Sequence, residues 1–354
     1  MKKMVGILMI VGLFTCACDN EETQNENETT NPTNTISSDK MLLVLSAPSI
    51  NDAYYSSALN LIVDFQVNYA KSIMGNDNVV IIVDRQTRHL YENRLPSDIL
   101  ITAEVYDIWM RDFSTVNPQS PVQFTYSWAS MTKRESEEVQ NSFNQFANTI
   151  GIERSKTNLI IDGGNLVDNY NGRVITTTRF LDDNNLTYAE GVAALKQQLG
   201  AAEVAIIVPD EEVLAHSDGM VSWFDDNTLL INDYTTDTNL RSQVLNELSS
   251  AFPGVNLVEI PVEYASNSPG QWDGFESACG INLNATTTYN NIYVPVFNMP
   301  HEEEALRLME ANTTKNIIRV NAEGVCAMGG SVRCLTWQLT GDNAEKLILA
   351  ARNQ

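Results

Sequence analysis

Cys334 is the first candidate for chemistry, because it follows Gly329 and Gly330 in the segment MGGSVRC of a chain with only 5 cysteines. A thiolate is a strong nucleophile, and glycines let the backbone approach a bound molecule closely. A buried, packed sulfur or half of a disulfide are the alternatives. Cys279 and Cys326 could pair with each other and leave Cys334 free, if one cysteine near the N-terminus is modified.

His216 is the second candidate, in a chain with 3 histidines. It lies two positions before Asp218 in HSDGM, and residues i and i+2 of an extended segment point to the same side. The two side chains could therefore reach one ligand together, although a surface turn is the alternative. His89 lies in a polar stretch and His301 at a helix start, and both are interpreted as structural.

Three further segments carry clusters of polar residues and glycines in otherwise apolar surroundings. They are DIWMRDFSTV at 107–116, DGGNLVDN at 162–169 and ACGINLNATTTYNN at 278–291. Together with the segments of His216 and Cys334, they give one cluster after each of five apolar strand patterns. This distribution predicts five loops that converge on a single site.

The elements that must position these loops alternate between helical and strand patterns from Met41 onward. Each helical pattern is followed by a short apolar run, and Gly or Pro punctuates most of the joints. The expected helix and strand pairs are 52–75 with 78–84, 135–151 with 158–162, 187–200 with 203–209, 239–254 with 255–261, and 301–313 with 316–321. A closing helix is expected over 343–354.

The alternation predicts an α/β fold but leaves its topology open. A doubly wound sheet is the common arrangement for alternating helices and strands. Five similar units could instead form a radial array, as repeat architectures do.

The N-terminus predicts export. Two lysines precede an apolar run of about a dozen residues, which is too short to span a membrane as a helix. A cysteine directly after such a run resembles a bacterial lipoprotein signal, with Cys18 the first choice for lipidation and Cys16 the second. We expect a signal peptide at 1–17, a disordered tether at 18–40 and one catalytic domain at 41–354. The expected location is the bacterial outer membrane, to which the lipid anchors the chain, with surface exposure if the acidic residues after Cys18 act as an export signal. An ordinary cleaved signal is the alternative.

The charge balance limits the classes of partner that the protein is expected to bind. The chain has 45 acidic and 22 basic residues and a net charge of −23. Binding to nucleic acid is not expected, because it needs a basic surface. A cationic substrate would suit the acidic field, although solubility alone also explains such a charge.

The segments together resemble the bacterial (Porphyromonas-type) peptidylarginine deiminase and agmatine deiminase family of guanidine-modifying enzymes. The resemblance spans about 41–340 and places the family's motifs in order. They are Asp-x-Trp-x-Arg-Asp (107–112), carboxylate-Gly-Gly-Asn (162–165), His-x-Asp (216–218) and Gly-Gly-x-x-x-Cys (329–334). The resemblance implies a five-bladed α/β propeller of ββαβ units.

The resemblance also implies a mechanism and a set of site residues. Asp112 and Asp218 would grip the planar guanidinium through paired charge-assisted hydrogen bonds. Cys334 would attack its central carbon, and His216 would move the protons. The substrate-binding residues implied are Asp162, Asn284 (with Asn282 as the second choice), Trp109, Arg134 and Gly330. No metal and no organic cofactor is expected.

Departures from the family motifs bear on the choice between three substrates. Agmatine deiminases usually have Glu before Gly-Gly-Asn and Ile-His before the cysteine, where this chain has Asp162 and Val332-Arg333. With the export signal, these departures favour peptidyl-arginine, converted to peptidyl-citrulline, over agmatine (converted to N-carbamoylputrescine) or free arginine. In the secreted relatives arginines bind a C-terminal carboxylate, and Lys133 and Arg134 lie in roughly that region. A non-catalytic binding protein of the cell surface is the alternative from another class.

Overall fold

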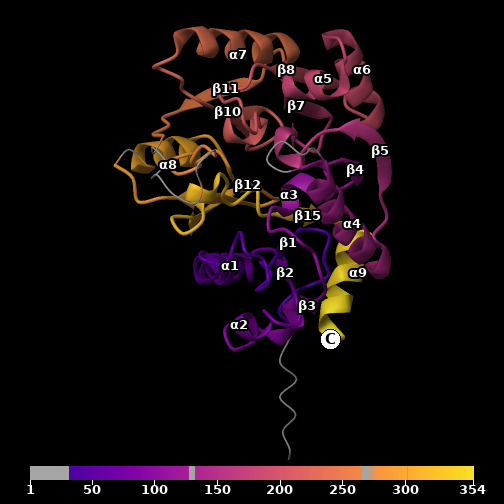
Figure 1. Ribbon diagram of the computed structural model, residues 1–354. Helices are drawn as coiled ribbons and strands as arrows, with labels where there is room; N and C mark the ends of the chain where they lie inside the picture. The colour runs from indigo at the N-terminus through magenta and orange to yellow at the C-terminus, as the bar shows by residue number, and fades with distance from the viewer. Residues whose placement is uncertain (1–31, 127–131, 265–271, 273–274, 301) are drawn as a thin grey trace, which may run out of the picture. The chain divides into compact units, whose positions relative to one another are not determined.

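A helix connects two parallel strands in each of five sheets (Figure 1). The structure is a computed structural model that describes residues 32–126, 132–264, 272, 275–300 and 302–354. The parallel pairs with their connecting helices are β1 (Leu42–Ser46), α1 (Leu59–Ile73) and β2 (Asn78–Val83); β4 (Val122–Thr125), α4 (Lys133–Ile150) and β5 (Ser155–Ile160); β7 (Arg173–Thr177), α5 (Arg179–Asn184), α6 (Tyr188–Leu199) and β8 (Glu203–Ile207); β10 (Thr228–Asn232), α7 (Thr238–Ala251) and β11 (Asn256–Ile260); and β13 (Asn291–Val296), α8 (Glu302–Ala311) and β14 (Asn316–Asn321).

An antiparallel segment flanks the first strand of each parallel pair. Four of these segments are strands, and in the fifth sheet an isolated bridge joins Val116 to Val122 of β4. The strands are β15 (Trp337–Leu339) beside β1, β6 (Val167–Asp168) beside β7, β9 (Val221–Trp223) beside β10, and β12 (Thr286–Thr287) beside β13. The expected ββαβ order is therefore present, and β15 from the end of the chain completes the sheet that β1 begins.

Local sequence signals explain where the helices begin and end. Thr132 accepts from the backbone N–H of Glu135, whose carboxylate accepts from the backbone N–H of Thr132, a capping box that starts α4. Gly151 ends the same helix with φ of 79°, a left-handed conformation that glycine adopts without strain. The helix is amphipathic and packs Val139 and Phe143 into a core with Trp337 of β15.

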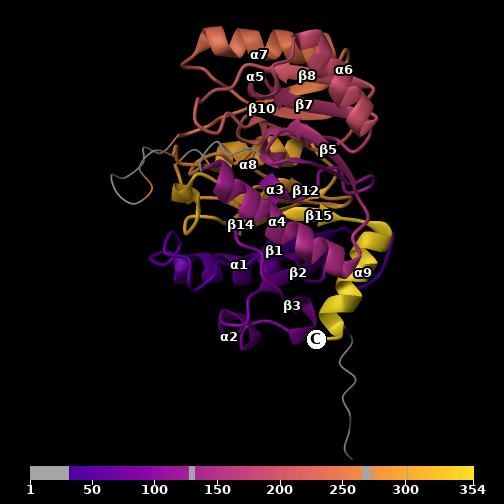
Figure 2. The ribbon, with the colours of Figure 1, turned by 45° about the vertical axis from the view of Figure 1, so that its right-hand side comes forward.

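The remaining elements are short, apart from the last helix. The closing helix expected over 343–354 is α9 (Gly341–Arg352), which lies against β3 (Leu100–Thr102) at the edge of the first sheet (Figure 2). The others are α2 (His89–Glu92), α3 (Met110–Phe113) and the 3-10 turns η1 (Ser97–Ile99), η2 (Gly163–Asn165), η3 (Ser217–Gly219) and η4 (Cys326–Met328).

The compact unit begins earlier in the chain than the sequence predicted. It covers Pro32–Gln354, so residues 32–40, expected to belong to a disordered tether, are part of the domain. Asn34 is buried and exchanges two hydrogen bonds of 2.8 and 2.9 Å with the backbone of Val79. Thr33 binds Asp98 through its backbone N–H and its hydroxyl. Asn34 therefore supplies bonds to the backbone at the start of β2, where β3 does not pair with it, a use that apolar periodicity does not reveal.

Outside this unit, Cys16, Cys18 and the predicted signal peptide lie beyond the described residues. Within the part of the chain that the structure describes, no helix is long and apolar enough to cross a membrane.

Candidate active site

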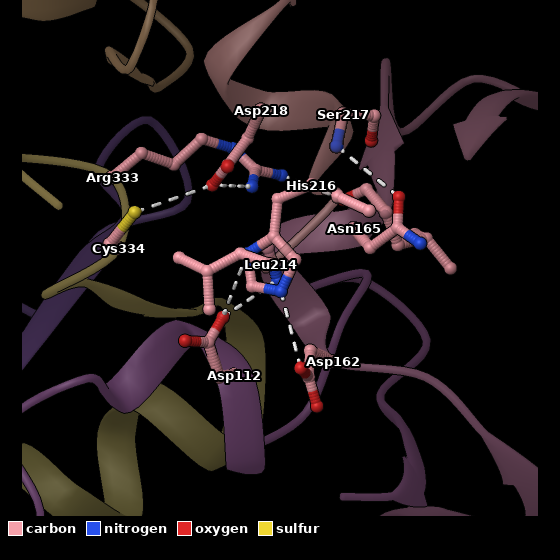
Figure 3. A network of polar contacts seen from close by, with 12 residues as sticks. Asp112, Asp162, Asn165, Leu214, His216, Ser217, Asp218, Arg333 and Cys334 are labelled. Atoms are coloured by element: carbon pink, nitrogen blue, oxygen red, sulfur yellow. Dashed lines mark hydrogen bonds and ion pairs between the residues drawn. The ribbon is translucent and has the colours of Figure 1, made fainter. Parts of the chain in front are cut away.

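The predicted site segments occupy equivalent positions in the five sheets. Each comes directly before, or forms, the antiparallel segment that flanks a parallel pair: Asp112 on α3, Asp162 before η2, His216 and Asp218 at η3, Asn284 before β12, and Cys334 before β15. Their side chains meet in one buried cluster (Figure 3). The sequence prediction that five loops share one site is thereby confirmed in its geometry.

Cys334 is a free, buried thiol in this cluster. Its Sγ lies 3.2 Å from Asn284 Nδ2, which donates to it, and 3.7 Å from Asp218 Oδ2. Burial raises the pKa of the Cys334 thiol well above its usual range, and the nearby carboxylates of Asp218 and Asp112 raise it further, while the Asn284 hydrogen bond lowers it. The thiol therefore needs a positive charge beside it before it ionises near neutral pH.

His216 lies between two carboxylates. Its Nε2 is 3.2 Å from Asp162 Oδ2, and its Nδ1 is 3.9 Å from Asp112 Oδ1. Burial opposes a charge on the ring, but Asp112 and Asp162 outweigh it and raise the pKa of His216 to about 9. The ring is therefore protonated at neutral pH and has a proton to give to a leaving group.

The surroundings of Asp112 disfavour the ionised form of its carboxyl group. Burial, with the charges of Asp162 and Asp218, raises its pKa to about 7, although His216 lowers it. The backbone N–H of Gly164 donates to Asp112 Oδ1 at 3.0 Å. A Cβ on Gly164 would lie 2.5 Å from His216 Nδ1 and 2.7 Å from Asp112 Oδ1, so the Gly-Gly pair is needed to let these groups approach.

Two of the predicted substrate-binding residues, Asp162 and Gly330, contact other residues of the site. Asp162 is bonded to His216, which makes it the partner that orients the ring. Gly330 gives room to Trp109, because a Cβ there would lie 2.5 Å from the indole ring. Trp109 in turn lines the cavity in front of Cys334, as predicted. Asn282 bonds Pro295 and Glu302 instead, which leaves Asn284 as the asparagine of the site.

Arg134 is not brought to the site. It lies near the start of α4 with its side chain 85% exposed, and its Nε pairs with Glu138 at 2.9 Å. Glu138 and Glu135, not Arg134, line the cavity. A position close to a motif in the sequence does not say which face of a helix turns inward, and the amphipathic pattern of α4 places Arg134 on the outside.

Two cavities meet at the candidate nucleophile. One, of about 370 Å³, is lined by Tyr54, Tyr55, Trp109 and Tyr126 and by the carboxylates of Asp52, Asp107, Glu135 and Glu138. The other, of about 270 Å³, is lined by Tyr234, Tyr264, Asp210, Glu211, Asp237 and Glu276. Both include Leu214, His216, Gly329 and Cys334, so the cleft extends to both sides of the thiol.

The structure adds two features that the sequence left open. Arg333, noted in the sequence only as a departure from the family pattern, forms an ion pair of 2.9 Å with Asp218. Cys279 and Cys326, whose pairing the sequence left open, form a disulfide that ties the loop before Asn284 to η4. Among the described residues, no group of His, Cys, Asp and Glu is arranged to hold a metal ion.

The cluster defines a class of enzyme: a buried thiol opposite a protonated histidine, between carboxylates suited to a planar cation. The chain matches the family model of the Porphyromonas-type peptidyl-arginine deiminases over residues 37–339 and belongs to that family. It is therefore a hydrolase that acts on carbon–nitrogen bonds of linear amidines. No curated protein matches the chain.

Solved structures share the fold at low sequence identity. The agmatine deiminase of C. jejuni is 21% identical with a TM-score of 0.70, and the match covers 87% of this chain and 96% of that one. The agmatine deiminase of Enterococcus faecalis is 16% identical with a TM-score of 0.69, over 85% and 93% of the two chains. A putative arginine deiminase from Porphyromonas gingivalis is 16% identical with a TM-score of 0.66, over 85% and 96%.

Proposed function

We propose that this protein hydrolyses the guanidinium group of peptidyl-arginine to the ureido group of peptidyl-citrulline, with release of ammonia. One observation carries the proposal: a free buried thiol lies 3.7 Å from one carboxylate, with a histidine bracketed by two others across the same cavity. Carboxylates on several sides suit a guanidinium, which is planar and donates in several directions.

The mechanism follows from the positions of these groups. With the guanidinium held by Asp112 and Asp218, the Cys334 thiolate attacks its central carbon and gives a tetrahedral adduct. His216 gives its proton to the departing nitrogen, the carbon–nitrogen bond breaks, and ammonia leaves a thiouronium. His216 then takes a proton from water, whose oxygen bonds the same carbon. The carbon–sulfur bond breaks, the thiol is restored and the ureido product leaves.

The cleft favours an arginine inside a peptide chain. Cavity space opens on two sides of Cys334, which gives room for a substrate larger than a small guanidine. Among the described residues that line the two cavities there is no lysine or arginine, and eight carboxylates of the lining lie outside the catalytic cluster. Apart from His216, the charged groups of the lining repel the α-carboxylate of free arginine or of a C-terminal arginine.

Agmatine is the second candidate, and the same acidic lining supports it. Agmatine carries an amine at the end opposite its guanidinium, and the carboxylates of Asp52, Glu135 and Glu138 line the cavity that such a tail would enter. The solved structures with this fold include agmatine deiminases, which adds to the case for a small guanidine.

A substrate panel tests the proposal. Ammonia and ureido product would be measured without added metal on a peptide with internal arginine, a peptide with C-terminal arginine, free arginine and agmatine, with Cys334→Ala as the control. We expect the internal arginine to be turned over fastest and Cys334→Ala to be inactive. Preference for agmatine would move the assignment to the second candidate. A well-folded protein that turns over none of the four would reject the function.

We further propose that the five units surround one axis as a five-bladed α/β propeller. The support is that every site segment occupies the same place in its ββαβ unit, so a radial arrangement brings all five to one centre. An experimental structure in which the five sheets do not surround the site would contradict this arrangement.

We propose, too, that the protein is exported and lipidated at Cys18. The apolar run before Cys18 supports this, and so does the Cys279–Cys326 disulfide, because disulfides persist in oxidising compartments. Cys18→Ser should abolish palmitate labelling and move the protein out of the membrane fraction, with Cys16→Ser as the matched control. Labelling lost only in Cys16→Ser would assign the lipid to Cys16.

A further inference from the structure

The protein places a guanidinium of its own on a carboxylate that should receive the substrate's. Arg333 is only 6% exposed, and its Nη1 donates to Asp218 Oδ2 at 2.9 Å (Figure 3). Its Nη2 donates to the backbone carbonyl of Leu166 at 2.8 Å. An arginine bonded in two directions at this depth has a fixed position, since its planar fork has little freedom left.

The two oxygens of the Asp218 carboxylate have different contacts. Both the Arg333 contact and the 3.7 Å approach of Cys334 Sγ use the Oδ2 oxygen. A substrate guanidinium would therefore take Oδ1. Asn284 ties the same segment down, because its Oδ1 accepts from the backbone N–H of Arg333 at 3.1 Å while its Nδ2 donates to the sulfur.

The charges around the sulfur explain why a cation is needed behind Asp218. The charged groups around Cys334, Asp218 and Arg333 come from several elements: Arg111 and Asp112 on α3, Asp168 in β6, His216 and Asp218 at η3, and the exposed Glu276 of the second cavity. Most of these are carboxylates, and a bare Asp218 at 3.7 Å opposes a negative charge on the sulfur most directly.

We infer that Arg333 is a positioning residue for the reaction: it fixes Asp218 with one oxygen free for the substrate and offsets its charge so that Cys334 can ionise. The inference rests on the proposed function, because it assigns Asp218 to the substrate and Cys334 to the attack. The opposing idea is that Arg333 merely fills the guanidinium site and keeps substrate out, in which case its removal would raise activity.

The test compares Arg333→Met in the full chain with Arg241→Met as the matched control. Arg241 also forms an ion pair, since it donates to both oxygens of Glu259 at 2.5 and 2.6 Å, but this pair is partly exposed and lies between α7 and β11. The first readout is the rate of alkylation of Cys334 by iodoacetamide at pH 8, followed by mass spectrometry of the peptide that contains it. The second is kcat and KM on the substrate that the panel selects. Thermal unfolding shows that each variant is folded.

We expect Arg333→Met to slow alkylation about threefold or more, because loss of the cation raises the pKa of Cys334 and leaves less thiolate, while the more basic sulfur recovers part of the rate. We expect kcat to fall about tenfold while KM stays the same or decreases, since an unshared Asp218 attracts the substrate cation more strongly. Arg333→Lys, which keeps the charge, should alkylate within about twofold of the wild-type rate.

If the alkylation rate and kcat of Arg333→Met equal those of Arg241→Met, the inference is wrong. Increased activity of Arg333→Met would also overturn it. If Arg333→Met does not fold, Arg333→Gln makes the same test, since it removes the charge and keeps a donor. The alkylation readout needs no substrate. A wild-type protein inactive on every guanidine therefore rejects the proposed function, while the comparison of alkylation rates still decides the electrostatic role of Arg333.

Discussion

Asp112→Asn should make the folded protein more stable while it removes activity. The carboxyl of Asp112 has a pKa of about 7 in the folded protein, against about 4 for an unperturbed aspartate. Burial is the largest cause, followed by the neighbouring charges of Asp162 and Asp218. The folded state therefore binds the proton of Asp112 more tightly than the unfolded chain does, so holding this carboxyl ionised costs stability.

The sign and size of the effect follow from this difference. Below about pH 4 the carboxyl is protonated in both states and costs nothing. The cost grows as the pH rises and is complete above pH 7, where three pKa units correspond to about 4 kcal/mol. Asparagine carries no charge and keeps an oxygen to accept from Gly164. We expect a gain of about 2 to 4 kcal/mol at pH 8, falling below about 2 kcal/mol at pH 5.

Chemical denaturation of the wild type and of Asp112→Asn at pH 8 and pH 5 measures this gain. Asp52→Asn is the matched control, because Asp52 lines the same cavity outside the catalytic cluster and its Oδ1 accepts from the backbone N–H of Tyr54. The gain should be confined to Asp112→Asn and should shrink at the lower pH. An Asp112→Asn protein that is no more stable than the control at pH 8 would refute the reasoning, since the ionised carboxyl would then be held without cost.

Three further outcomes are expected. Gly164→Ala should lower kcat/KM by about a hundredfold, because its Cβ would displace His216 and Asp112; Gly324→Ala, whose Cβ would meet no atom closer than 3.5 Å, should stay near wild type. The pH profile of kcat/KM should be bell-shaped, with an acidic limb at about 7 where Asp112 becomes protonated and an alkaline limb at about 9 where His216 loses its proton; a flat profile between pH 6 and 10 would contradict both roles. Cys279→Ser should lower the free energy of unfolding by about 4 kcal/mol, because the disulfide closes a loop of 47 residues; equal denaturation midpoints would show that the bond does not constrain the unfolded chain.

Much of the fold could be predicted because its elements are locally encoded. The helix expected over 187–200 is α6 (Tyr188–Leu199), and it begins at the capping box of Thr187 and Glu190. The strand expected over 316–321 is β14, with the same bounds. Periodicity and caps act within a few residues, so a single sequence reveals them.

The short antiparallel strands were harder to predict than the helices and the parallel strands. β6 and β12 have two residues each, too few to show any period, and they exist because a neighbouring strand pairs with them. The bonded segment at Thr33–Thr35 has the composition of a disordered tail, and its side-chain bonds to residues 78, 79 and 98 are long-range. Neither feature leaves a local signal in the sequence.

The prediction of the site residues has the same limit, because long-range contacts leave no local signal in the sequence. The order of the motifs identified Asp112, His216, Asp218 and Cys334, and the structure brings all four together. Sequence reasoning did not assign Asp162 to His216, since which acid meets the ring depends on how two loops cross. Arg333 was visible only as an unusual residue beside Cys334, because an ion pair with a residue 115 positions away has no signature in one sequence.

The charges of the site make the nucleophile depend on its substrate. The carboxylates of Asp218 and Asp112 are the charges that act on the sulfur, while the cations of Arg111 and Arg333 act on Asp218, so negative charge is in excess beside the thiol. A thiolate on Cys334 would add to that excess, and its pKa is accordingly high. A guanidinium that enters the site neutralises the excess beside the sulfur. We therefore expect the thiol to ionise mainly when substrate is bound, which keeps a reactive sulfur protonated, and less open to oxidation, in the free enzyme.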